Sequence, residues 1–168
     1  MVIFLSGCPM RCLYCHNPDT WDPKGGTPMT AEEILDQYEQ ARPFYKKGGI
    51  TVSGGEPLMQ IGFVTELFEK AKKSGIHTCL DTSGITFNPG SQAVMAHFER
   101  LLASTDLILL DIKHIDPKEH VKLCAQPQDN ILARLMSSEI SALMPLSCKS
   151  RCTASNVSRE TIVPRCAP

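Results

Sequence analysis

One stretch of the chain joins a short apolar segment to a loop with three cysteines, Val2-Ile3-Phe4-Leu5-Ser6-Gly7-Cys8-Pro9-Met10-Arg11-Cys12-Leu13-Tyr14-Cys15-His16-Asn17. Residues 2–5 are continuously apolar and short, as in a buried strand. Three residues and then two separate the cysteines, so one turn of chain can place three thiolates around a small inorganic core. Thiolates are the usual ligands of iron–sulfur clusters, and a four-iron cluster has four corners to ligate. Three local ligands leave one iron open, which indicates chemistry on a bound molecule.

The same loop admits two other interpretations. Zinc is one, because Cys15 and His16 could complete a site of three cysteines and one histidine. Adjacent Cys and His side chains rarely converge on one ion, so we favour the iron–sulfur interpretation over zinc. Lipid attachment is the other, since Leu5-Ser6-Gly7-Cys8 is similar to a lipoprotein box. We do not expect it, because residues 1–4 have no basic residue and too few apolar residues for an export signal.

Length and composition limit the class of protein. The 168 residues suit one domain, and a net charge of −1 argues against a surface for nucleic acid. No apolar run approaches a membrane span, so we expect a soluble, cytoplasmic protein without a membrane partner. The cytosol keeps thiols reduced, so the eight cysteines favour metal binding over a disulfide framework.

Strand and helix signals alternate from the start of the chain to about residue 123. A capping box, Thr30-Ala31-Glu32-Glu33, predicts the start of the first helix, and a second helix follows Pro57 and stops at Gly75. The remaining predicted elements are strands at 50–52, 76–80 and 107–110 and a helix at 91–103. This alternation predicts an α/β fold with parallel strands, either an open sheet or part of a barrel.

Every unusual polar cluster directly follows a predicted strand. After the cysteine loop come Ser53-Gly54-Gly55-Glu56-Pro57, Asp81-Thr82-Ser83-Gly84 and Asp111-Ile112-Lys113-His114. The loops after parallel strands meet at one rim and carry function in such folds. The sequence therefore predicts one site at this rim.

Residue types in these clusters suit a zwitterionic, partly planar ligand. Asp111 and Lys113 face the same side of an extended chain and offer a carboxylate and an ammonium to an amino acid moiety. The alternative is an exposed ion pair with little energetic value. Tyr14 and His16 flank Cys15 and could pack on a heterocycle. Gly55, in the paired glycines, lets backbone groups approach a ligand closely.

Four segments, residues 7–21, 51–57, 77–84 and 110–114, together resemble the radical S-adenosylmethionine enzymes. Among these, the chain is most similar to the pyruvate formate-lyase activating enzymes, a family of glycyl-radical activases. The resemblance implies a partial (β/α) barrel with about four β/α units, followed by an irregular tail. It also implies a [4Fe-4S] cluster on Cys8, Cys12 and Cys15, with the open iron chelated by S-adenosylmethionine.

The resemblance also assigns the remaining site residues. Tyr14, Cys15 and His16 line the adenine side, and Gly55 contacts the amino group of the cofactor. Asp81 and Thr82 match residues that hold a monovalent cation in this family. One wall of the cofactor site is formed by Asp111, Ile112, Lys113, His114 and Ile115.

The implied reaction is reductive cleavage of S-adenosylmethionine to a 5′-deoxyadenosyl radical, which takes hydrogen from a glycine of a pyruvate formate-lyase-type enzyme. Flavodoxin or ferredoxin would be the reductant, and we expect a monomer. No cysteine occurs between Cys15 and Cys79, which favours the formate-lyase type over relatives with extra ferredoxin-type cysteines. Two alternatives stay open: an anaerobic ribonucleotide reductase activase, and an inactive fragment that binds a cluster or zinc without catalysis.

The chain departs from the family pattern at both ends. The family's segment before the first strand and its later strands have no counterpart, so we expect exposed sheet edges. The family's Leu-Thr-Gly appears as Leu123-Cys124-Ala125. We therefore expect a partial barrel over 1–123 and a divergent, poorly ordered tail over 124–168, and we hypothesise that the tail is frameshifted or alternatively terminated.

Overall fold

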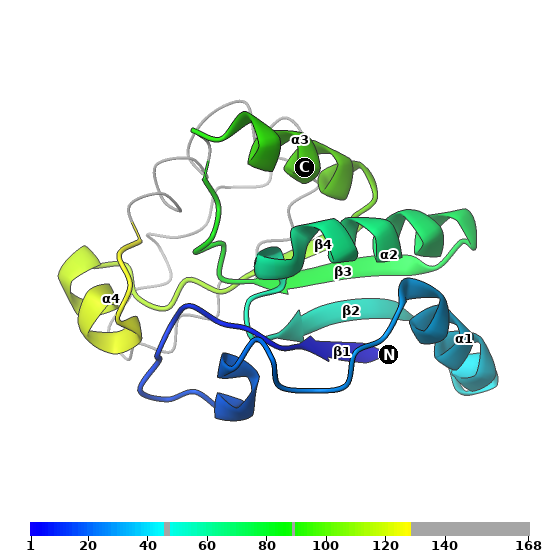
Figure 1. The fold of residues 1–168 in the computed structure, drawn as a ribbon, viewed down its shortest axis with the longest axis horizontal. Helices are drawn as coiled ribbons and strands as arrows, with labels where there is room; N and C mark the ends of the chain where they lie inside the picture. Colours follow the sequence, from blue (N-terminus) through cyan, green and yellow to red (C-terminus); the bar gives the residue numbers. More distant parts are fainter. Residues whose placement is uncertain (46–47, 89, 129–168) are drawn as a thin grey trace, which may run out of the picture.

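The computed structural model describes residues 1–45, 48–88 and 90–128. These residues form one four-stranded sheet in the order β1-β2-β3-β4, and each neighbouring pair is parallel (Figure 1). The strands are β1 (Val2–Leu5), β2 (Gly49–Gly54), β3 (His77–Thr82) and β4 (Leu107–Leu110). The predicted α/β architecture with an open parallel sheet is thus confirmed, although β2 and β3 extend two residues further along the chain than predicted.

Four α-helices and three short 3₁₀ helices connect and flank the described strands. They are η1 (Pro18–Trp21), α1 (Ala31–Ala41), η2 (Arg42–Phe44), η3 (Pro57–Gln60), α2 (Ile61–Lys73), α3 (Gln92–Ala103) and α4 (Pro117–Cys124). Thr30 caps α1 as predicted, with the Glu33 amide donating to its hydroxyl and the Glu33 carboxylate accepting from the Thr30 amide. The second predicted helix starts with a 3₁₀ turn, in which the Glu56 side chain accepts from the Leu58 amide and Pro57 occupies the first position.

The structure adds a helix that the sequence analysis did not predict. Asp116 caps α4 by accepting from the amides of Lys118 and Glu119 at 2.9 and 3.0 Å, and Pro117 occupies its first turn. Ala125 ends the helix in the left-handed conformation, with φ 58°. At eight residues, α4 is too short to show a clear helical periodicity in the sequence.

The hydrophobic core lies between one face of the sheet and helices α1, α2 and α3. Ile50 and Val52 alternate with more exposed neighbours along β2, so their side chains share the face that meets the helices. Val64, Leu67 and Phe68 of α2 are fully buried against this face. This packing fixes the strands in register and leaves their carboxyl ends free to build a site.

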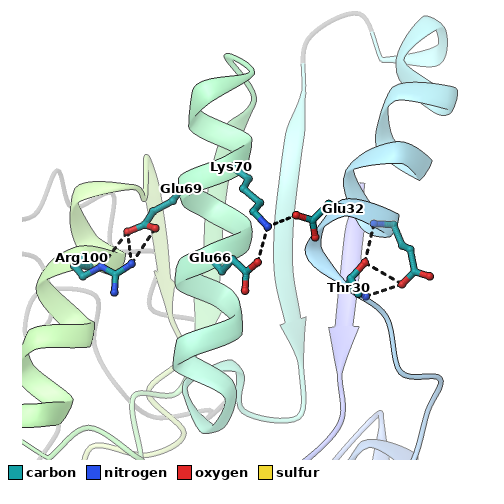
Figure 2. Close-up of polar contacts among 7 residues, drawn as sticks. Thr30, Glu32, Glu66, Glu69, Lys70 and Arg100 are labelled. Carbon is teal, nitrogen blue, oxygen red and sulfur yellow. Dashed lines mark hydrogen bonds and ion pairs between the residues drawn. The ribbon is translucent and has the colours of Figure 1, made fainter.

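Exposed ion pairs link α2 to the helices on either side of it (Figure 2). Lys70 contacts Glu32 of α1 and Glu66 of α2. Arg100 of α3 binds both oxygens of Glu69 through one nitrogen, at 2.9 and 3.0 Å. Such exposed pairs contribute at most about 1 kcal/mol each, so the buried contacts and not these ions hold the helices in place.

The carboxyl ends of the strands point to the same side of the sheet, where the cysteine loop and α4 also lie (Figure 1). None of the helices within the described ranges is both long and apolar enough to cross a bilayer. Cys124 and Gln126 contact the cysteine loop, whereas residues 129–168 of the predicted tail lie outside the described residues.

Candidate active site at the carboxyl rim

A cavity of about 280 Å³ lies at the carboxyl rim, and residues from the loops after all four strands line it. The cysteine loop and η1 supply much of its wall. The lining residues are Cys8, Met10, Cys12, Tyr14, Cys15, His16, Asn17, Thr20 and Trp21, with Ser53, Gly54 and Gly55 at the end of β2, Asp81, Thr82 and Ser83 at the end of β3, and Asp111 and Lys113 after β4.

Two sets of contacts fold the cysteine loop back on itself. The Arg11 guanidinium donates to the carbonyl oxygens of Cys8 and Met10, each at 2.7 Å, and lies 5.1 Å from the centroid of the Trp21 ring. The Gly7 amide donates to the carbonyl of Thr20 at 2.7 Å, and Gly7 has a φ of 101° that favours glycine. The loop is therefore held on one side by η1.

The end of α4 holds the other side of the same loop. The amides of Arg11 and Leu13 donate to the carbonyls of Cys124 and Leu123 at 2.9 and 3.0 Å. The Gln126 side chain donates to the Pro9 carbonyl at 3.0 Å. These contacts explain why Cys124 is fully buried beside Cys8 and Cys12.

The three motif cysteines share the cavity but differ in environment. Burial raises the pKa of the Cys8 thiol. A hydrogen bond from Cys124 and the nearby Lys113 ammonium lower the pKa of Cys12 to about 7 despite its burial. Within the described residues, no group of three or more His, Cys, Asp or Glu side chains is already arranged to hold a metal ion. Three thiols on one cavity nevertheless fit the donor set of an iron–sulfur cluster, one of them poised to ionise near neutral pH.

The paired glycines let the loops after β1 and β2 touch. A Cβ on Gly54 would lie 2.3 Å from the Leu5 nitrogen, and one on Gly55 would lie 2.2 Å from the Gly7 oxygen. Instead, the Gly55 amide donates to the Leu5 carbonyl at 2.9 Å, and the Glu56 amide donates to the Gly7 carbonyl at 2.8 Å. Here glycine is required for close backbone approach and, at Gly54, for a φ of 111°.

Glu56, whose role was not predicted from the sequence, is only 1% exposed. One carboxylate oxygen accepts from the Leu58 amide at 3.1 Å and from the Thr82 hydroxyl. The other accepts from the amide of Ser83 at 3.0 Å and from its hydroxyl. The carboxylate therefore ties the loop after β2 to the loop after β3, and its burial raises the pKa of Glu56. The sequence signal that could have indicated this role is the position of Glu56, a charged residue directly after two glycines and before the apolar Pro57 and Leu58.

The predicted cation residues line the cavity, and each is already hydrogen-bonded to a neighbour. The Ser53 hydroxyl donates to the Asp81 carboxylate at 3.0 Å. The Thr82 hydroxyl donates to Glu56 and accepts from the Gly84 amide at 2.9 Å. Asp81 and Thr82 are thus neighbours on the wall at the end of β3, and Ser53 joins them from β2.

Asp111 and Lys113 form an ion pair on the wall after β4. The Lys113 side chain is 17% exposed, and its ammonium lies 5.9 Å from the centroid of the Tyr14 ring. Although burial opposes it, the hydrogen bond to Asp111 raises the pKa of Lys113. The alternative of a fully exposed surface pair does not describe this geometry, because both side chains line the cavity.

Three predicted wall residues do not line the cavity. Ile112 is buried in a small apolar group with Leu110. His114 is turned to its own loop, where its Nδ1 accepts from the Asp116 amide at 2.9 Å. Ile115 is 39% exposed. The alternation of an extended chain places Asp111 and Lys113 on the cavity side and explains why Ile112 and His114 face away from it, but it does not account for Ile115.

Known proteins share both the sequence and the fold. The Radical SAM superfamily matches residues 2–136. The pyruvate formate-lyase-activating enzyme of Staphylococcus aureus (strain USA300) is 47% identical over 134 residues, which are 78% of this chain and 53% of that protein. The enzyme of Staphylococcus aureus (strain NCTC 8325 / PS 47) gives the same values. The chain therefore spans about half the length of the curated relatives it matches.

Crystal structures of SuiB from Streptococcus suis share the fold. The structure bound to the precursor peptide SuiA has a TM-score of 0.59 and 19% identity, covering 77% of this chain and 27% of SuiB. The structure bound to S-adenosylmethionine has a TM-score of 0.55 at the same identity and coverage. Taken with the four motifs at one rim, these matches place the chain in the radical SAM superfamily, as a sequence relative of the pyruvate formate-lyase-activating enzymes.

Proposed function

We propose that the rim cavity holds a [4Fe-4S] cluster on Cys8, Cys12 and Cys15 and binds S-adenosylmethionine beside it. The observation that carries this proposal is the meeting of three thiols with the Asp111–Lys113 pair on one cavity. A bound cluster supplies the electron that cleaves S-adenosylmethionine to a 5′-deoxyadenosyl radical. The role of the protein is to bind, orient and shield these groups.

The residues of the cavity suit the parts of S-adenosylmethionine. Lys113 and Asp111 offer opposite charges to the carboxylate and the amino group of its methionine moiety. Gly55 would meet the amino group through its carbonyl oxygen, because its amide already donates to Leu5. Tyr14 and His16 lie on the same wall and offer planar faces to adenine.

We further propose that Asp81 and Thr82 hold a monovalent cation, with Ser53 beside them. Side-chain oxygens of this kind are suitable ligands for hard cations. On the wall after β4, Ile112, His114 and Ile115 would support Asp111 and Lys113 and would not contact the cofactor. Their placement outside the cavity favours that division of roles.

By relation to the S. aureus enzymes, we propose that the radical acts on a glycine of a pyruvate formate-lyase-type enzyme. The same proposal includes flavodoxin or ferredoxin as the reductant, a monomeric protein and a cytoplasmic location. It also includes a boundary between the partial barrel of residues 1–123 and the tail of residues 124–168.

Anaerobic reconstitution with ferrous salt and sulfide tests the proposal. We expect a brown chromophore with bound iron and sulfide, and formation of 5′-deoxyadenosine after chemical reduction with S-adenosylmethionine, measured by mass spectrometry. Cys12→Ala should abolish this product. Cys79→Ala is the matched control, because Cys79 is a buried cysteine of β3 that does not line the cavity. Unchanged product from Cys12→Ala, or a colourless wild-type protein, would contradict the proposal.

A further inference from the structure

We propose that the turn after α4, Gln126-Pro127-Gln128, sets the position of the cysteine loop relative to the wall after β4. We call residues 126–128 the glutamine turn. Its two glutamines are positioning residues, because each donates a hydrogen bond to one of these walls. Together they hold the three thiols at a fixed distance from Asp111 and Lys113. This inference rests on the proposed function, because that distance matters only for a molecule that contacts both walls.

Within the described sheet, no strand pairing connects the two walls. β1 and β4 are its edge strands, so the loops that follow them do not leave from neighbouring strands (Figure 1). The cysteine loop follows β1, and Asp111 and Lys113 follow β4. A contact from outside the sheet is therefore needed to fix the distance between these walls. The end of α4 and the glutamine turn contact both.

Gln126 holds the cysteine loop at the carbonyl of Pro9, to which its Nε2 donates at 3.0 Å. The carbonyls on either side, those of Cys8 and Met10, accept from the Arg11 guanidinium of the same loop. Arg11 therefore fixes the shape of the loop, whereas Gln126 ties the loop to a part of the chain that is distant in sequence. This bond adds to the main-chain bonds that join the loop to the end of α4.

Gln128 holds the wall after β4. Its Nε2 donates to the carbonyl of Ile115 at 2.8 Å, and the residue is only 1% exposed. Ile115 follows closely after Lys113, whose side chain lines the cavity. Because solvent does not reach this donor, water does not replace the bond, and a buried donor without its acceptor is costly. Gln128 therefore keeps the loop that carries Lys113 in place.

The glutamine turn is itself fixed by α4. Buried His120 donates from Nδ1 to the Gln126 carbonyl at 2.8 Å. The Ala125 amide donates to the Val121 carbonyl at 2.8 Å, where the left-handed conformation of Ala125 ends the helix. The ring of Pro127 restricts its own φ. Both side-chain donors thus start from a restricted backbone.

This connection should matter for S-adenosylmethionine more than for the cluster. All three proposed cluster ligands belong to the cysteine loop, so a shift of the whole loop leaves their mutual spacing unchanged. S-adenosylmethionine would contact the cluster at one wall and the Asp111–Lys113 pair at the other, so the same shift would disturb its contacts. Binding groups must be held close to their productive geometry by the residues that support them. Loss of either glutamine donor should therefore weaken cofactor binding and leave the cluster intact.

The test is calorimetry of S-adenosylmethionine binding to the anaerobically reconstituted full chain, with iron and sulfide analysis of every protein. Gln126→Met and Gln128→Met remove the donor and keep a side chain of similar length. Gln126→Lys keeps a donor at this half-buried position. Gln40→Met is the matched control, because it makes the same exchange at an exposed position of α1.

We expect both Met variants of the turn to keep the iron and sulfide content of the wild type and to bind S-adenosylmethionine at least about tenfold more weakly. Gln126→Lys and Gln40→Met should bind it as the wild type does. Wild-type affinity in either folded Met variant of the turn would overturn the inference and leave the proposed function intact. Binding by Gln126→Lys as weak as by Gln126→Met would overturn it too, because the donor would not be responsible.

Cluster content separates this inference from a simpler role in folding the cysteine loop. Loss of the cluster from Gln126→Met would overturn the inference, because the glutamine would then support the ligands themselves and not their distance from the other wall. Urea unfolding checks each fold; if Gln128→Met does not fold, the two variants of half-buried Gln126 decide the outcome. A wild-type protein that assembles no cluster would overturn the proposed function and this inference with it.

Discussion

Glu56→Gln is the sharpest test of how the rim is assembled. Each oxygen of the Glu56 carboxylate accepts from a main-chain amide, one from Leu58 at 3.1 Å and the other from Ser83 at 3.0 Å. A glutamine has one oxygen and one NH₂ group. In either orientation, its NH₂ group therefore faces an N–H that cannot turn away.

The expected loss follows from that mismatch. A buried donor left without an acceptor costs about 1–3 kcal/mol, and the site is only 1% exposed, so water does not replace the lost partner. We expect Glu56→Gln to lower the free energy of unfolding by about 2 kcal/mol. Rotation of the Thr82 and Ser83 hydroxyls does not relieve the clash, because both affected donors belong to the main chain.

Equilibrium unfolding in urea, with reduced metal-free protein, measures this loss. Glu69→Gln is the matched control, because Glu69 forms an exposed ion pair with Arg100 and should change stability by less than about 1 kcal/mol. Hydrogen exchange at the Leu58 and Ser83 amides should accelerate only in Glu56→Gln. A Glu56→Gln protein as stable as the Glu69→Gln control, with unchanged exchange at these two amides, would refute the reasoning.

Three further changes probe other parts of the same rim and its support. Gly55→Ala should disrupt the packing of the first two loops and lower the yield of 5′-deoxyadenosine, because its Cβ would lie 2.2 Å from the Gly7 oxygen. Gly62→Ala is the control and should fold and react as wild type, because its Cβ would meet no neighbouring atom within 4 Å. Lys113→Gln should weaken S-adenosylmethionine binding to reconstituted protein at least about tenfold in calorimetry, a loss of about 1.4 kcal/mol, and equal affinity would contradict a role for its ammonium. Although partial burial opposes it, the Lys72 ammonium and Thr78 lower the pKa of Asp106, so Asp106 stabilises the fold at neutral pH and this contribution is lost as the pH falls below about 4. Urea unfolding between pH 6 and pH 3 should therefore show a steeper acid loss, on the order of 1 kcal/mol, in wild type than in Asp106→Asn, and parallel curves would contradict it.

Much of the fold follows from patterns between near neighbours in the chain. Short apolar runs predicted all four described strands, and the Thr30 capping box predicted the start of α1, because strand burial and helix capping depend on residues a few positions apart. The 3₁₀ start at Pro57 was missed, because a capped first turn with a proline at its start suits α-helical and 3₁₀ geometry alike.

For the candidate site, too, the sequence predicted some residues correctly and others not. Chain periodicity placed Asp111 and Lys113 on one side, and the structure brings both to the cavity. The same periodicity turns Ile112 away from the cavity, so the prediction that all five residues of 111–115 form the cofactor wall was too broad.

The spacing of three cysteines and the polar residues after each strand were readable directly, because ligand spacing and strand alternation are local properties of a chain. The contact of Cys124 with the cysteine loop and the position of the Glu56 carboxylate between two loops arise from folding, because each joins residues that only the parallel sheet and α4 bring together. Burial then changes their chemistry, because it strengthens the hydrogen bonds to the Glu56 carboxylate and makes each unpaired polar group costly. Local sequence therefore supplied the ligands, and long-range packing supplied the environment that tunes them.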